Sequence, residues 1–269
     1  MAKTKSAGST AWKIIVGVLV AVLIIVLLAE FGMRWFTAKQ MKDQFHAAAE
    51  EDGIEVSEEP TISFGSSPLI FGVLKGEVSQ LEMHTPSTLQ INGNVITGQP
   101  EATIDMEGMT LSDDPVARHM VATTLIPEDY LLITFQEAIA DQSGVDMLRD
   151  VVVTDITANG EQGVLDFQLG GGLATISLQP TAVDGQLHLE ATESTLFGIS
   201  LPEEATQSIS EGLSKGMQDQ FTGDLAIEDV TIEDGAVSIR VAGDNVNFQE
   251  MSQQMSQTSE AVEDPAPAS

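Results

Sequence analysis

The chain has 269 residues, a formal net charge of −30 and no cysteine. A surface this acidic repels nucleic acid at long range, so nucleic-acid binding is excluded. The absence of cysteine excludes a disulfide framework, a thiolate metal site and thiol chemistry. Almost all of the acidic residues follow residue 42, in a stretch long enough to form one domain with its own core.

The first predicted element is a membrane-spanning helix over residues 14–36. The run from Ile14 to Ala29 contains no charged residue, but as a helix it would rise only about 24 Å, so the segment continues to Phe36 to match the bilayer. Trp12 and Trp35 bracket the segment, and indole rings prefer the two headgroup zones. The sequence therefore predicts a single-pass anchor at the cell membrane, with a cytoplasmic N-terminus over residues 1–13.

A cleaved signal peptide is the competing interpretation, with Lys3, Lys5 and Lys13 as its basic region. Signal-peptide cleavage requires small residues at −1 and −3, and the candidate sites after Ala29 and Ala38 both lack them at −3. Either interpretation places residues 37–248 outside the cytoplasm as one α+β domain. Residues 249–269 are polar and contain proline, which predicts a disordered tail.

Within the domain, residues 34–51 have helical spacing, and short strands with period-two alternation follow. The clearest strands surround Ile104, Phe167, Ile176, Leu189 and Ile239, and pairs such as Asp184-Gly185 form the turns between them. Proline followed or preceded by acids predicts helices that begin near residues 113–115, 127–129 and 202–204, the second running to about residue 142 and the third to about residue 223. This pattern indicates an antiparallel sheet with one covered face.

No catalytic constellation is present in the sequence. The four histidines lie in unrelated contexts, and zinc, calcium-loop, nucleotide-binding and nucleophile-elbow motifs are all missing. We therefore expect no enzyme activity, no cofactor and no metal. The most unusual feature is apolar: residues 62–76 hold two phenylalanines, Leu, Ile and Pro between glycines. Such a segment is either a buried loop at a sheet corner or an exposed lip that touches lipid.

The pattern F-G-x-x-P-L-I-x-G-x-L-x-G over residues 64–76 resembles the actinobacterial LmeA-like phospholipid-binding family. Stretches at 98–100, 125–131, 172–176, 184–187 and 196–202 agree with it, so the resemblance covers residues 35–248. It implies an elongated fold of the tubular lipid-binding type, in which a curved antiparallel sheet wraps around a long helix and encloses an apolar channel. It also implies phospholipid binding and a part in the maturation of envelope glycolipids.

The sequence thus predicts a membrane-anchored envelope protein that binds or transfers a phospholipid or glycolipid without chemistry. The alternative is an envelope scaffold with a closed core and no lipid. The candidate lipid-binding residues are the apolar members of the 64–74 segment, one helix residue and inward strand positions: Phe45, Phe64, Pro68, Leu69, Ile70, Phe71, Leu74, Ile176, Leu178, Leu187 and Leu189.

Overall fold

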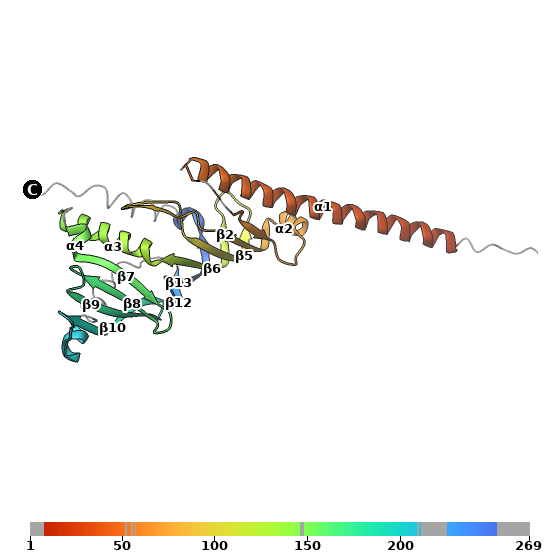
Figure 1. Cartoon of the computed structure of the whole chain (residues 1–269). Coiled ribbons are helices and arrows are strands. Elements are labelled where there is room, and N and C mark those ends of the chain that lie inside the picture. The colour runs from red at the N-terminus through yellow and green to blue at the C-terminus, as the bar shows by residue number, and fades with distance from the viewer. Residues whose placement is uncertain are drawn as a thin grey trace, which may run out of the picture.

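The computed structural model describes residues 8–51, 53–54, 56, 58–145, 148–208, 210 and 225–251. It has the predicted α+β class, with two open antiparallel sheets and helices packed on them. Figure 1 shows the long helix α1 (Gly8–Glu51) projecting beyond the sheets at one end of the molecule, and the short helix α4 (Arg149–Val152) at the other end. The molecule is therefore elongated.

The first sheet has six strands in the order β1-β2-β5-β6-β13-β12, and every neighbouring pair is antiparallel. One of its cores includes Val78, Leu81, Met106 and Met120, on which Met33 and Met41 of α1 pack. Its strands have these bounds: β1 Thr61–Ser63, β2 Glu77–Thr85, β5 Glu101–Thr110, β6 Val116–Pro127, β12 Ala226–Glu233 and β13 Ala236–Asn247. A separate hairpin pairs β3 (Gln90–Asn92) with β4 (Val95–Thr97).

The second sheet has five strands in the order β11-β10-β9-β8-β7. Its inner face is covered by α3 (Glu128–Ser143), whose Phe135 meets Phe167 edge to face, and by Ile232 and Val237 of the first sheet. The two sheets therefore share one core. The strand bounds are β7 Val153–Asn159, β8 Val164–Leu169, β9 Ala174–Val183, β10 Gln186–Leu196 and β11 Ile199–Ser200.

The predicted single sheet around one long helix is wrong in its arrangement. The chain forms two sheets because the hairpin β12–β13 joins the edge of β6, while β7 to β11 pair among themselves. The longest helix, α1, packs on the core of the first sheet that includes Leu81 and Met106. The helix that packs on the second sheet, α3, has only 16 residues.

Two local predictions also need correction. Residues 113–115 begin no helix, because Val116–Pro127 forms strand β6 and pairs with β5 and β13. The Asp-Asp-Pro sequence lies in the turn before β6, where the Val116 N–H donates to Thr110 Oγ1. The segment around Leu69 is neither a loop nor a bulge but helix α2 (Leu69–Lys75). The helix predicted from 202 is described only over 203–208 and at 210.

The first residues of the predicted disordered tail, 249–251, have defined structure. Residues 248–251 form a helical turn, Phe248 and Met251 pack on the first core, and Gln249 Nε2 donates to the Asp113 carbonyl. Residues 252–269 lie outside the described part of the chain.

In the part of the chain that the structure describes, no helix is long and apolar enough to span a membrane. The predicted anchor falls partly outside this part, since the side chains of residues 8–19, 21 and 22 are not described.

Candidate functional site

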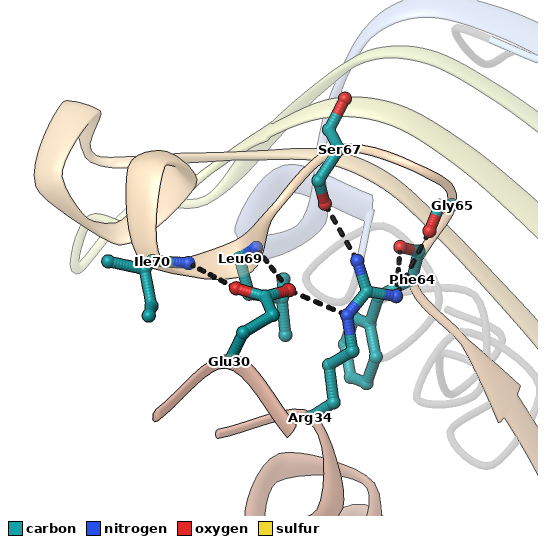
Figure 2. Close-up of polar contacts among 7 residues, drawn as sticks. All are labelled: Glu30, Arg34, Phe64, Gly65, Ser67, Leu69 and Ile70. Carbon is teal, nitrogen blue, oxygen red and sulfur yellow. Dashed lines mark hydrogen bonds and ion pairs between the residues drawn. The ribbon is translucent and has the colours of Figure 1, made fainter. Parts of the chain in front are cut away.

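The helix α1 is fastened to the domain by the carboxylate of Glu30. Its Oε1 accepts the backbone N–H of Leu69 at 2.7 Å, and its Oε2 accepts that of Ile70 at 3.0 Å (Figure 2). These are the first N–H groups of α2, which have no partner within their own helix. A carboxylate from a distant helix therefore caps α2, in place of the side-chain cap that Pro68 cannot supply.

Arg34, one turn later on α1, completes the same junction. Its Nε donates to Glu30 Oε1 at 2.6 Å, and its two Nη atoms reach three backbone carbonyls, those of Phe64, Gly65 and Ser67, at 2.8 to 3.0 Å. Figure 2 shows the guanidinium lying inside the loop that precedes α2. The junction, defined by Glu30 and Arg34, fixes where the domain begins along α1.

The electrostatics of the junction favour the charged form of Glu30. Burial raises the pKa of the Glu30 carboxyl, but the N–H groups of Leu69 and Ile70 and the Arg34 guanidinium together lower it below its ordinary value of 4.5. The carboxylate is thus ionised at neutral pH, when it caps α2 and holds Arg34.

Beside the junction, α1 and α2 expose large apolar side chains. Phe71, Val73 and Leu74 are exposed on α2, and Phe31 and Trp35 are exposed on α1. The opposite side of α2 packs closely against the first sheet: at Gly72 the backbones are so near that a Cβ would lie 2.5 Å from the Glu77 carbonyl oxygen. This packing fixes the orientation of α2, so Phe71, Val73 and Leu74 face solvent.

The second candidate region is the inner face of the second sheet. The strand register places Ile156, Phe167, Ile176 and Ser194 in one row across β7, β8, β9 and β10. The first three belong to the shared core. Ser194 is only 2 % exposed, and among the described residues its Oγ has no hydrogen-bond partner. The apolar row thus ends in an unsatisfied hydroxyl at β10.

A groove of ≈ 1160 Å³ runs along β10 at this point. Its far wall is the segment after β11, which is tied to the strand edge because the Leu201 N–H donates to the Ser194 carbonyl and the Ala191 N–H donates to Ser210 Oγ. The strand pairing of β10 with β9 shifts at a bulge between Ala191 and Glu193, next to the Ala191 N–H that bonds Ser210.

The groove lining combines apolar and hydroxyl side chains. Leu189, Ala191 and Leu201 supply apolar surface, and hydroxyl groups come from both walls, notably Ser194 and Thr206. Three carboxylates lie at the groove but no Lys or Arg does, among the described residues: Glu190, Glu193 and Glu203. Such a lining suits acyl chains and groups that donate hydrogen bonds better than a bare phosphate.

The structure separates the predicted site residues into two regions that do not meet. Phe64 and Leu69 are buried in the first core and Leu178 in the shared core. Ile70 and Phe45 are half-buried near α1, whereas Pro68, Phe71 and Leu74 are exposed. Ile176, Leu187 and Leu189 are half-buried on the second sheet, and of all the predicted residues only Leu189 lines the groove. Lipid contact at any of them stays a prediction.

Sequence reasoning missed the polar lining of the groove. The segment 200–210 reaches β10 through long-range contacts that no local pattern encodes. Ser194 carried no such signal either, because it is out of phase with Leu187, Leu189 and Ala191, and only the bulge after Ala191 turns it inward. Across the described residues, no three His, Asp or Glu side chains gather where they could hold a metal ion.

Comparison with known proteins agrees with the resemblance seen in the sequence. No curated protein and no solved structure matches the chain significantly. The sequence model of one family does match, over residues 28–242, which include the junction, both sheets and the groove. The chain belongs to the LmeA-like phospholipid-binding family.

Proposed function

We propose that the chain binds a phospholipid or glycolipid non-covalently in the groove along β10 and carries it between sites in the envelope. The single observation that supports this most is the groove itself, in a chain whose family is described as phospholipid-binding. The apolar inner face of the second sheet continues into the groove at Leu189 and Ala191, where acyl chains would lie.

The charge of the groove bears on the headgroup. Since three carboxylates, one histidine and no Lys or Arg line it among the described residues, we infer that an anionic headgroup such as a phosphoinositide would be repelled. An amine-bearing or sugar headgroup could instead donate to these carboxylates. We infer that the ligand is a zwitterionic phospholipid or a glycolipid, in keeping with a part in envelope glycolipid maturation.

We also infer that residues 14–29 attach the domain to the membrane as a single pass, with the domain outside the cytoplasm. The support for attachment is the uncharged run in the sequence. The support for sidedness is position, since a short basic leader precedes the run and one long acidic body follows it. Glu30 and Arg34 are engaged by the domain, so the membrane segment ends before the junction. Because residues 14–29 rise only about 24 Å as a helix, the bilayer would thin locally around them. Carbonate extraction and protease protection of intact cells would test both attachment and sidedness.

The binding proposal is tested by extracting the purified full chain with organic solvent and identifying lipids by mass spectrometry. We expect roughly one lipid per chain. Thr206 lines the groove and is buried, whereas Ser208, on the same helical segment, is exposed and does not line it. Thr206→Trp should therefore empty the groove, and Ser208→Trp should retain the lipid. A wild-type chain without lipid would contradict the proposal and favour the scaffold alternative.

A further inference from the structure

Apolar side chains gather at the end of the second sheet where α4 lies. Leu173, Leu196, Phe197 and Ile199 are exposed at the two hairpin turns there, and Val151 and Val152 are exposed on α4. The Phe197 N–H donates to the Leu173 carbonyl at 2.7 Å, and the Gly170 N–H donates to the Val152 carbonyl at 3.1 Å. These six residues form one patch, which we name the apolar tip.

Charge is sparse at the apolar tip. The stretches 151–152, 170–173 and 196–201 contain no Asp, Glu, Lys or Arg, although the chain holds 41 acidic residues. The charged residues of α4, Arg149 and Asp150, lie just before Val151. Phe197 is 70 % exposed and Ile199 is 72 % exposed. An uncharged apolar patch on a strongly acidic protein marks a contact surface, and its partner must be apolar, because electrostatic attraction to the patch is absent.

The backbone at Phe197 provides an independent indication. Phe197 has φ +51° and Gly198 has φ +74°, and the turn at the opposite end of β10 has nearly the same angles, +53° at Asp184 and +79° at Gly185. Asp tolerates this left-handed conformation, so Asp184 is an ordinary turn residue. Phe197 is a bulky aromatic residue in the same conformation, and its side chain is exposed to solvent. Folding alone would be served better by Asp or Asn.

We propose that the apolar tip inserts into the surface of a zwitterionic phospholipid bilayer and delivers lipid to the groove. This rests on the proposed function. The tip leads directly into the groove, because Ser200 and Leu201, which follow Ile199, are part of the groove lining. Figure 1 places the tip's helix α4 at the end of the molecule away from the projecting α1. A protein of net charge −30 reaches a bilayer by local apolar insertion, since headgroup attraction is not available to it.

The chain's lack of cysteine makes a single label specific. We would attach a fluorophore to Leu173→Cys in the full chain and reconstitute the labelled protein in phosphatidylcholine vesicles. A nitroxide-labelled lipid, which quenches the fluorophore on contact, is then placed either in the same vesicles or in added acceptor vesicles. We expect the fluorescence to fall several-fold with the nitroxide in at least one of these two bilayers. The control label is Glu161→Cys, in the turn between β7 and β8 at the opposite end of these strands, and it should stay unquenched.

The decisive variant is Phe197→Asp, which gives this turn the Asp-Gly sequence of residues 184–185. It should leave the melting temperature unchanged or raise it, and abolish quenching at Leu173→Cys. Leu111→Asp, at an exposed apolar position in the turn after β5, should change neither. Quenching that survives Phe197→Asp, or that is lost in Leu111→Asp instead, would overturn the proposal. The lipid content of the purified chain, measured separately, tests the groove. Bound lipid without quenching at Leu173→Cys would contradict insertion of the apolar tip but not the carrier function. Quenching without bound lipid would contradict the carrier function but not insertion of the tip.

Discussion

Replacing Glu30 by Ala should loosen the attachment of α1 to the domain. The side chain is only 13 % exposed, and its carboxylate accepts two backbone N–H groups and one guanidinium N–H. A hydrogen bond to a charged group contributes about 1.5–3 kcal/mol, and the two N–H groups of α2 would lose their acceptor. Arg34 is 28 % exposed and can regain water, so we count only the two backbone N–H bonds, take the lower end for each, and expect a loss of about 3 kcal/mol.

For a domain of this size, that loss lowers the melting temperature by about 6–12 °C. The assay is thermal unfolding of the full chain in detergent, together with hydrogen exchange at the Leu69 and Ile70 amides. Exchange at these amides should accelerate even where α1 detaches without unfolding the sheets. In a double-mutant cycle, Glu30→Ala and Arg34→Ala should be non-additive because the two side chains share one network.

The matched control lies one turn further along the same helix. Lys39 and Asp43 form an ion pair with the same i,i+4 spacing, but both side chains are more than half exposed. Lys39→Ala should change stability by less than about 0.5 kcal/mol. If Glu30→Ala matches Lys39→Ala in both melting temperature and amide exchange, the reasoning about the junction is refuted.

Three further predictions follow from the same region. Because the pKa of Glu30 is lowered in the folded state, its stabilising effect is full above pH 4.5 and disappears as the pH falls through the folded-state pKa. The difference in melting temperature between the wild type and Glu30→Gln should therefore shrink only in acid. A difference that stays constant with pH would contradict this. Gly72→Ala should destabilise the domain by about 1–3 kcal/mol, because its Cβ would meet the Glu77 carbonyl. Gly32→Ala, in open space on α1, should instead stabilise the domain by up to about 1 kcal/mol. Denaturant titration measures both variants, and equal effects would contradict the close approach at Gly72. Leu69→Asp should abolish cooperative unfolding, and Phe71→Asp should leave it intact, which circular dichroism would distinguish.

The strands were largely predictable because their signals are local. The strands around Ile104, Phe167, Ile176, Leu189 and Ile239 are all present, and Asp184-Gly185 forms the turn that its residue types indicate. Period-two alternation arises within one strand and needs no partner to be read. The family was recognisable as well, since glycine and proline spacing is kept in the sequence itself.

The arrangement of the sheets and the helix α2 depends on contacts between distant residues. Nothing between residues 64 and 76 shows that a carboxylate at Glu30 caps Leu69 and Ile70, so the sequence alone predicts a loop or an exposed lip there. Likewise, alternation identifies the strand at Ile239 but does not say which sheet it joins. The groove was missed for the same reason, because Thr206 and Ser210 reach β10 only through tertiary contacts.

Charge and shape together give the two proposals a common physical basis. At physiological ionic strength the repulsion between an acidic surface and anionic lipid falls off within about 8 Å, so it acts only where the surface approaches the bilayer closely. The acidic flanks of the elongated domain would meet this repulsion along their whole length, whereas the apolar tip and the exposed side of α2 would not. On a bilayer that contains anionic lipid, the acidic body would therefore restrict membrane contact to the ends of the molecule, whereas on a purely zwitterionic bilayer apolar insertion alone would determine the contact. On this view the net charge of −30 orients the protein toward a bilayer without taking part in lipid binding, and substituting acids on the flanks by Ser should weaken that orientation while leaving the bound lipid in place.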